Sequence, residues 1–270
     1  MATVVGAGQS AASGTEAEAG RTTRLQIRKI DVADVIECIQ MGVRDFSRAP
    51  KYGLFFGAVY AFGGLLILWI AFSIGYYYLA YPLIMGFALL APFGAAGTYE
   101  ISRRLETGEP LSWSGVLGAV WNRAGKELGW LALVSLFTFI IWLDLAVFLF
   151  LMFYGMDVPT LEQMFTRIFT TTYGLMFVVV GNVLGAMIAL FVFSFTSVSP
   201  PLIVDRNIDF VTAMSTSVRA VIANPRAMLA WAVVISANLA ISFATLFLAL
   251  LVIFPVLGHA TWHLYRKVIV

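Results

Sequence analysis

Charged side chains are scarce in this 270-residue chain: Asp, Glu, Lys and Arg make up 12% of it, against 60% hydrophobic residues. A soluble domain carries about 25% charged residues, so the composition excludes an ordinary soluble protein and indicates a polytopic membrane protein. Cys38 is the only cysteine, which excludes an intramolecular disulfide and a thiolate cluster. Walker, GxSxG and HExxH sequences are all absent. We therefore expect a protein that is not an enzyme.

The N-terminal residues lack an apolar core. The first 20 are rich in Ala, Gly, Ser and Glu, so no cleavable signal peptide is expected. Residues 1–24 are predicted to form a disordered cytoplasmic tail. Residues 25–270 are predicted to form a single transmembrane domain.

Long apolar runs dominate this domain. Crossing about 30 Å of hydrocarbon takes roughly 20 residues. The runs that reach this length are 52–73, 77–99, 128–153, 173–198, 226–244 and 246–265. The last two follow each other without an obvious turn, so 226–265 is either two spans or one broken span. The sequence predicts an all-α bundle of six transmembrane helices, arranged as three hairpins.

Positive charge is distributed unevenly around these spans. With six spans, 16 of the 17 Lys and Arg residues lie on one side of the membrane, and only Arg167 lies on the other. Because cations gather on the cytoplasmic side, we expect both termini in the cytoplasm. A single span over 226–265 would place Arg266 and Lys267 outside, which favours the even number.

Two segments before long apolar runs are alike. DVIECIQMGVRDFSRAPK, residues 34–51, aligns with DFVTAMSTSVRAVIANPR, residues 209–226. Each begins with an Asp suited to N-capping, carries an apolar stripe at helical spacing and breaks at a Pro. In the first copy the stripe consists of Val35, Ile39, Val43 and Phe46.

A third, weaker copy is WSGVLGAVWNRAGK, residues 113–126, in which Gly125 is the expected breaker. The sequence therefore predicts three repeats, about 31–104, 111–200 and 205–268. Each repeat would begin with a cytoplasmic-side amphipathic helix. On these helices Arg44, Arg48, Arg219 and Arg226 are predicted to contact anionic lipid headgroups.

The ends of the first and third repeats also align. PFGAAGTYEISRR, residues 92–104, lies over PVLGHATWHLYRK, residues 255–267, which places His263 opposite Glu100. The only two histidines, His259 and His263, are four residues apart, a spacing that a metal site would use. Because the repeat offers only Glu100 as a further ligand, we expect interfacial histidines instead. His263 is predicted to pair with Glu100, His259 to pack against a neighbouring hairpin, and no metal or cofactor is expected.

Polar residues inside the spans are few. Asp144 is either a proton or cation site or a hydrogen-bonded carboxyl that faces the bundle. Asn182 and Asn238 lie near mid-membrane and could share a polar centre with it, or act as hydrogen-bonding contacts between helices. The spacings Gly53–Gly57 and Gly181–Gly185 indicate close helix packing.

The segment SVSPPLIVDRNIDFVTAMSTSVRAVIANPRAMLAWAVVI and the ending LGHATWHLYR resemble an uncharacterised family of six-span bacterial inner-membrane proteins, a domain of unknown function. The elements PPLIVDR and SVRAVIANP are distantly similar to the membrane domain attached to some glycerophosphodiester phosphodiesterases. The resemblance implies a multi-pass protein of the bacterial cytoplasmic membrane. It implies no catalytic residues.

Two classes of function fit these features. The first is a non-enzymatic scaffold, assembly or membrane-organising protein whose amphipathic helices lie in the headgroup layer. The second is a transporter or channel for a small solute, with a path between the hairpins. The expected partners are membrane lipids and another membrane protein or a second copy of the chain; no nucleic acid is expected.

The predicted topology can be tested by cysteine labelling. In a Cys38-free background, single cysteines near Tyr78, Glu162 and Ala244 should react with an impermeant reagent from the periplasm, whereas a cysteine at Gly108 should not. External labelling at Gly108 would contradict the orientation. Loss of labelling near Ala244 alone would contradict two separate spans over 226–265.

Overall fold

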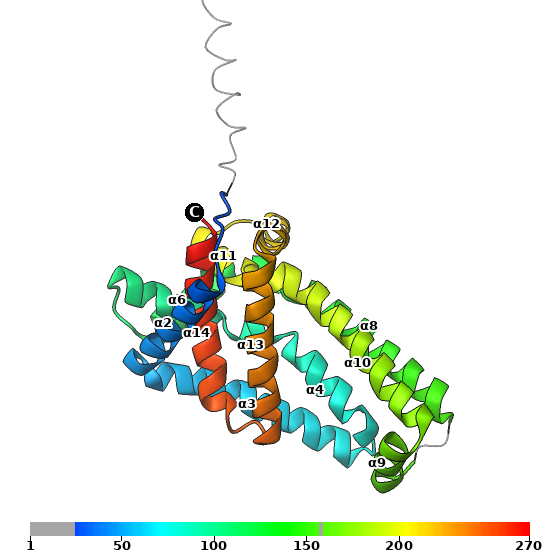
Figure 1. Ribbon diagram of the computed structural model, residues 1–270. Coiled ribbons are helices and arrows are strands. Elements are labelled where there is room, and N and C mark those ends of the chain that lie inside the picture. Colours follow the sequence, from blue (N-terminus) through cyan, green and yellow to red (C-terminus); the bar gives the residue numbers. More distant parts are fainter. Residues whose placement is uncertain (1–24, 157–158) are drawn as a thin grey trace, which may run out of the picture.

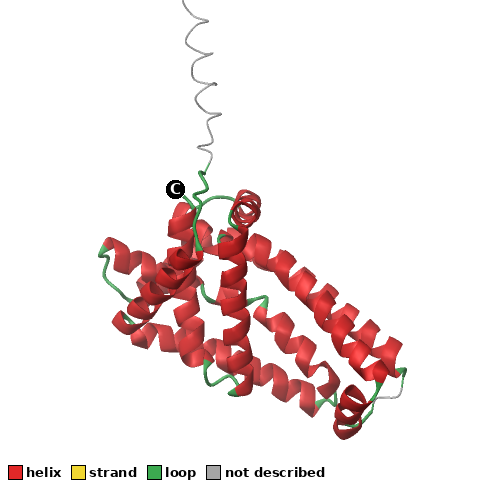
Figure 2. Cartoon of the chain, in the orientation of Figure 1, coloured by secondary structure: helices red, strands yellow, loops and turns green. Residues whose placement is uncertain are grey.

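The computed structural model describes residues 25–156 and 159–270, and nearly all of this part of the chain is helical (Figures 1 and 2). In chain order the elements are α2 (Val32–Arg48), α3 (Pro50–Ser73), the 3₁₀ turn η1 (Tyr77–Leu79), α4 (Ala80–Ala88), α5 (Ala91–Gly94), α6 (Ala96–Thr107), α7 (Trp113–Ala119), the π turn η2 (Val120–Ala124), α8 (Gly125–Tyr154), α9 (Leu161–Thr170), α10 (Thr172–Thr196), α11 (Ser199–Arg206), α12 (Phe210–Ala223), α13 (Pro225–Ala244) and α14 (Leu250–Val268). The expected all-α fold is confirmed for these residues. The expected tail, residues 1–24, lies outside them.

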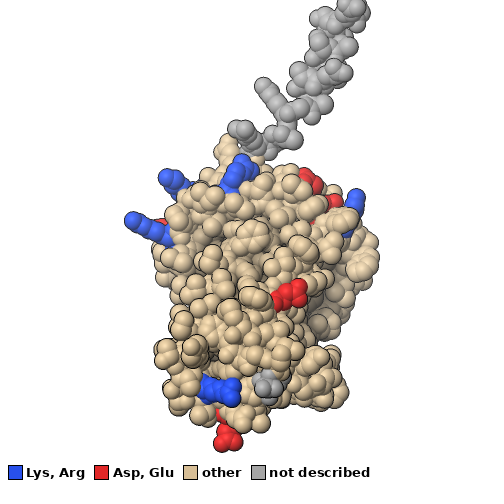
Figure 3. Space-filling model, turned by 90° about the vertical axis from the view of Figure 1, so that its right-hand side faces the viewer, with Lys and Arg blue, Asp and Glu red and all other residues tan. Residues whose placement is uncertain are grey.

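Four helical stretches are long and apolar enough to cross a membrane. They are α3, α8, the stretch Thr172–Arg206 that joins α10 and α11, and α13. Figure 1 shows α8 beside α10 and α13 beside α14 as antiparallel pairs, and both pairs are in contact. Figure 3 shows a broad uncharged band across one face, with charged groups towards both ends and one acidic side chain within it.

The expected span 77–99 is not among these four. It is divided into η1, α4, α5 and α6, with breaks near Leu89 and Ala95. Pro92 lies at the start of α5, where its missing N–H disrupts no helical hydrogen bond, but it cannot continue the hydrogen-bond pattern of α4. With 9 residues, α4 alone spans about 14 Å at 1.5 Å per residue. The expected span 77–99 is therefore not one continuous helix.

The run 226–265 is divided into two helices. α13 ends at Ala244 and α14 begins at Leu250. Between them Leu246 and Phe247 have φ angles of 50° and 65°, in the left-handed region that residues other than Gly seldom adopt. The chain reverses direction there, which rules out one continuous helix. α14 itself is not among the four strongly apolar stretches.

Two corners of the chain share one backbone conformation. Ala49, between α2 and α3, has φ −132° and ψ 48°, and Asn224, between α12 and α13, has φ −129° and ψ 51°. Both precede a proline at the first position of the next helix. A proline disfavours helical geometry in the residue before it, so the aligned Pro50 and Pro225 produce matching corners.

The predicted N-caps are only partly correct. Asp209 caps α12 through the backbone N–H of Thr212. In the first copy the cap is Asp31, and Asp34 is the third helical residue that bonds back to the Asp31 N–H. Asp34 as N-cap is therefore wrong, because the capping box places the cap three residues earlier.

The third copy lacks a corner. α7 continues through the π turn η2 into α8, so Gly125 does not break the helix. A glycine keeps its N–H and costs a helix only about 1 kcal/mol relative to Ala, whereas a proline costs about 3. The prediction of a break at Gly125 is wrong for this reason.

The helices that come before the apolar helices α3, α8 and α13 pack in a cyclic order. α7 contacts α6, α12 contacts α10 and α11, and α2 contacts α14. α7 and α12 therefore each lie against the helix that comes directly before them in the chain. α2 lies against α14, the last helix, which closes the cyclic order. An antiparallel bridge between Ile27 and Ile269 ties the two ends of the described chain together, with Arg28 N donating to Val268 O at 2.8 Å.

The best-buried part of the molecule lies where α6, α11 and α14 meet, which we call the packed end. Arg266 on α14 pairs there with Glu106 on α6 at 2.9 Å and with Asp205 on α11 at 3.5 Å. A single cation thus joins the three helices.

The Asn224 side chain should contribute measurably to stability. It accepts from Ile30 N at 2.8 Å and donates to Arg28 O at 3.1 Å, so Asn224→Ala leaves two partly buried backbone groups without these partners. We expect a loss of about 1–3 kcal/mol, measured as a lower thermal midpoint in mild detergent. Asn238→Ala is the control, because Asn238 bonds only the Val234 carbonyl of its own helix. Equal losses in both variants would contradict the role of Asn224 in joining the ends.

Candidate functional site

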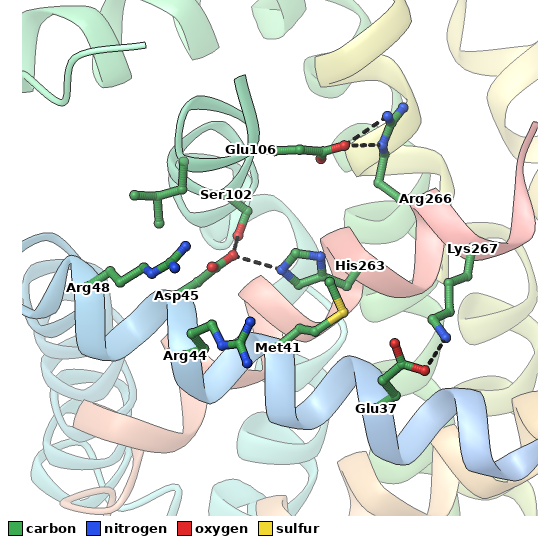
Figure 4. Close-up of a pocket in the computed structure, with 11 residues that line it drawn as sticks. Glu37, Met41, Arg44, Asp45, Arg48, Ser102, Glu106, His263, Arg266 and Lys267 are labelled. Atoms are coloured by element: carbon green, nitrogen blue, oxygen red, sulfur yellow. Dashed lines mark hydrogen bonds and ion pairs between the residues drawn. The ribbon is translucent and has the colours of Figure 1, made fainter. Parts of the chain in front are cut away.

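A polar cavity of about 320 Å³ opens between α2, α6 and α14 at the packed end. Most of the residues that line it are of polar or charged types: Glu37, Met41, Arg44, Asp45, Arg48, Ser102, Leu105, Glu106, His263, Arg266 and Lys267. Figure 4 shows these side chains converging from the three helices. The cavity joins residues from both ends of the sequence and from its middle.

Close approach of α14 to α2 positions the cavity. Val35, Cys38, Gly42 and Asp45 form the buried face of α2. A Cβ added to Gly42 would lie 2.7 Å from the carbonyl oxygen of Val256 and 2.8 Å from the backbone N of Ala260, closer than atoms can pack. Glycine at this position is therefore what allows the two helices to touch.

Asp45 lies one turn further along the same face and accepts two hydrogen bonds. Ser102 Oγ donates to Asp45 Oδ2 at 2.7 Å, and His263 Nε2 donates to the same oxygen at 2.7 Å. Burial would raise the pKa of Asp45, but the bonds from His263 and Ser102 favour the charged form and hold the pKa below its usual value. Asp45 is therefore an ionised carboxylate in an almost fully buried position.

The hydrogen bonds continue from Ser102 to His259, whose Nδ1 lies 2.8 Å from Ser102 Oγ. Because the serine proton is directed at Asp45, His259 must carry its own proton on Nδ1 and donate to the serine. Its Nε2 is buried without a hydrogen-bond partner among the described residues. This arrangement differs from a Ser–His–Asp triad. In a triad the carboxylate binds the same histidine that contacts the serine, whereas here Asp45 binds His263 and Ser102 contacts His259.

The charged rim of the cavity is partly neutralised. Lys267 pairs with Asp34 at 2.7 Å and with Glu37 at 2.6 Å, and Arg266 pairs with Glu106. Within the described part of the chain Arg44 and Arg48 form no ion pair, although both line the cavity. Figure 4 shows their guanidinium groups on the cavity side of α2. The cavity therefore has two cationic groups that no described carboxylate pairs with.

The expected pair of Glu100 and His263 is not formed. Glu100 is fully buried and binds Arg103 at 2.8 Å and Arg104 at 2.7 Å, while His263 binds Asp45. On an α-helix, residues two apart point about 200° away from each other. Ser102 on α6 contacts α14, so Glu100 faces the other way, towards the arginines.

The predicted polar centre within the spans is not assembled either. Asp144 is exposed on α8. Asn182 accepts from Tyr81 at 2.8 Å, and Asn238 donates to Val234 O of its own helix. Of these three predicted site residues, only Asn182 lines a cavity, and no hydrogen bond between described residues joins them. The sequence did not indicate the direction in which each of these side chains points.

The four predicted headgroup arginines fall into two pairs. Arg44 and Arg48 line the polar cavity, whereas Arg219 and Arg226 lie outside it, on α12 and α13. Arg219 makes one hydrogen bond, to Thr216 Oγ1 at 3.1 Å. Arg44 and Arg48 therefore have a defined cavity beside them, and Arg219 and Arg226 do not.

Sequence reasoning missed Asp45 and Ser102. One signal for Asp45 was present: it continues the helical spacing of Cys38 and Gly42, a face that adjoins the expected apolar stripe and shares Val35 with it. Among the described residues, no three His, Cys, Asp or Glu side chains are grouped as a metal site would require. The cavity instead offers arginine and histidine N–H groups, which suit an anion.

The charge on Asp45 should be visible in the pH dependence of stability. A carboxyl whose pKa is depressed in the folded state stabilises above its unfolded pKa, here near 3.8, and loses this contribution as pH falls through the folded pKa. We expect Asp45→Asn to cost about 1–3 kcal/mol at neutral pH, with the gap to wild type narrowing below pH 3.8. Chemical unfolding in detergent across pH measures this gap. A gap that stays constant at low pH would contradict an ionised Asp45.

Comparison with known proteins adds one match. No curated protein and no solved structure matches the chain. Residues 79–205, slightly less than half of the chain, match the model of a family described as "Predicted integral membrane protein (DUF2189)". This stretch runs from the end of η1 to α11 and includes Ser102 and Glu106, but neither α2 nor α14. The family match and the four apolar helical stretches together identify the chain as an integral membrane protein.

Proposed function

We propose that this is a non-enzymatic, membrane-organising protein that binds the anionic headgroup of a membrane lipid in the polar cavity. The observation that carries the proposal is the pair Arg44 and Arg48, one turn apart on α2, at the edge of a cavity whose carboxylates already have partners. Glu37 pairs with Lys267, Glu106 with Arg266 and Asp45 with His263. The two guanidinium groups remain available for a ligand.

The chemistry of these groups favours a phosphate. A guanidinium presents parallel N–H donors that match two oxygens of one phosphate, and its charge persists at any physiological pH. The cavity volume of about 320 Å³ lies at the lower end of the range for ligand pockets, about 300–1,000 Å³. A phosphate with a short polar substituent fits this volume better than a large ligand.

The position of α2 supports a lipid as the source of the phosphate. α2 leads directly into the apolar helix α3, and its Val32, Ile36 and Val43 are exposed beside the arginines. Exposed apolar and cationic side chains on one helix are typical of helices that lie at a membrane surface. Val35 of the expected apolar stripe packs into the core instead, so α2 would contact both the protein and the lipid.

In this proposal the protein belongs to a bacterial cytoplasmic membrane, with six spans in three repeats and both termini cytoplasmic. The polar cavity would then lie at the cytoplasmic surface, where anionic headgroups attract cations. Interaction with a second copy or with another membrane protein stays a prediction. A solute path gains no support from Asp144, which is exposed and lines neither cavity.

Lipid binding to matched double variants tests the proposal. Purified protein in mild detergent is titrated with phosphatidylglycerol, and with phosphatidylcholine as the neutral-headgroup control, by native mass spectrometry. We expect Arg44→Gln with Arg48→Gln to weaken phosphatidylglycerol binding about tenfold or more, because each charged hydrogen bond contributes roughly 1.5–3 kcal/mol. Arg219→Gln with Arg226→Gln removes the same charge away from the cavity and should change binding less than about twofold.

Two results would contradict the proposal. Equal weakening in both double variants would mean that binding reflects overall charge and not the cavity. Displacement of the lipid by millimolar inorganic phosphate would identify a soluble anion as the preferred ligand. Thermal midpoints of both variants, measured alongside, establish that a loss of binding is not a loss of folding.

A further inference from the structure

A second, larger cavity of about 870 Å³ lies between the helices at the level of the apolar spans. Its walls come from α4, α5, α10, α13 and α14. α10 packs on α8, α9 and α12, and α13 contacts α2, α12 and α14. Figure 1 shows the antiparallel pair α8–α10 diverging from α13, and the cavity is lined by α10 and α13 on facing sides.

The lining of this cavity carries no charge. None of the described residues that line it is Asp, Glu, Lys, Arg or His. Most of its hydroxyl groups are already engaged: Thr196, Ser197 and Thr261 donate to carbonyls of their own helices, and Tyr81 donates to Asn182. A ligand here would have to be bound almost entirely through apolar contacts.

Small side chains on opposite walls create the space. Gly181 was expected to allow close packing of α10 against another helix, yet a Cβ added there would meet no atom within 4 Å. Gly57 differs: its added Cβ would lie 2.6 Å from Leu251 O, so this glycine does serve packing. Across the cavity, Ala237 and Ala240 of α13 line it with equally small side chains. Gly181 thus widens the cavity and packs against nothing.

The volume decides what can fill the cavity. A ligand-sized hydrocarbon fits the range of about 300–1,000 Å³. The absence of charged lining residues excludes a ligand whose buried part is ionised, since an unpaired charge in such a place would be strongly disfavoured.

We propose that this cavity is a binding site for the hydrocarbon chain of a lipid. The proposal does not depend on the headgroup site, which lies on the other side of α14 between α2 and α6. The shared chemistry is a long, uncharged acyl chain, supplied by a phospholipid or by a free fatty acid. In this reading Gly181 and Ala237 set the width of the chain's path.

Photo-crosslinking with acyl-chain probes tests the site. Full-length protein is reconstituted in phosphatidylethanolamine and phosphatidylglycerol vesicles that contain either a phosphatidylcholine with a diazirine in one acyl chain or a diazirine-bearing palmitic acid. Labelled residues are identified by mass spectrometry. We expect labels to concentrate on cavity residues such as Ala189 and Ile235, above the level at Phe137 and Phe148, which are exposed on the outer face of α8.

Filling the cavity provides the matched comparison. Gly181→Leu adds a side chain into open space and should reduce cavity labelling about fivefold or more without changing labelling of the outer face. Gly129→Leu is the control, because a Cβ at Gly129 also meets no atom within 4 Å but Gly129 does not line the cavity. Ala237→Leu repeats the test from the opposite wall if Gly181→Leu lowers the thermal midpoint.

The outcomes separate the alternatives. Labelling by the phospholipid probe, by the fatty acid probe or by both supports the site and identifies its source of chains. Equal labelling of cavity and outer-face residues would overturn the proposal, because it would mean that bulk lipid contacts both surfaces alike and that the cavity is not a specific site. Cavity labelling that persists in folded Gly181→Leu and Ala237→Leu proteins would overturn it as well.

Discussion

The contact between α2 and α14 at Gly42 determines most of what is distinctive in this structure. Without a side chain at that position, the backbone of α14 comes close enough for Asp45 to reach His263, and for His259 to reach Ser102 on α6. The packing of α2 on α14 also closes the cyclic packing order, and the bridge between Ile27 and Ile269 joins the two ends of the described chain. An ionised carboxylate can be buried there because Ser102 and His263 both donate hydrogen bonds to it.

Different interactions hold the helices together at the packed end and between the apolar spans. Where α6, α11 and α14 meet, hydrogen bonds, ion pairs and buried aromatic groups hold the helices together. Between the spans, apolar surface gains little from leaving lipid for protein, so close packing requires small residues that fit a partner. Gly57 has such a partner and Gly181 does not. The helices therefore stay joined at one end and diverge within the apolar zone, which leaves the larger cavity.

Local patterns in the sequence predicted the features that depend on local chemistry. The prolines Pro50 and Pro225 marked two corners correctly, and the apolar runs located α3, α8, α10 and α13. The polar site could not be predicted in the same way, because Asp45 and His263 are 218 residues apart in the chain. Helical spacing indicated that α2 has an apolar stripe, but α2 packs on α14 through the face that carries Gly42 and Asp45. Spacing identifies faces of a helix and does not identify their partners.

The difference between six expected spans and four strongly apolar stretches has a physical cause. Very little of α10 is covered by other parts of the chain, so a helix in its position must be apolar to be stable in lipid. α14 is surrounded by α2, α3 and α6, and its polar side chains meet protein partners: His263 binds Asp45, and Trp262 and Arg266 bind Glu106. Hydropathy therefore reports which helices contact lipid. A helix enclosed by its own chain can carry polar groups whose partners come from neighbouring helices, which is why hydropathy selects α10 and leaves out α14.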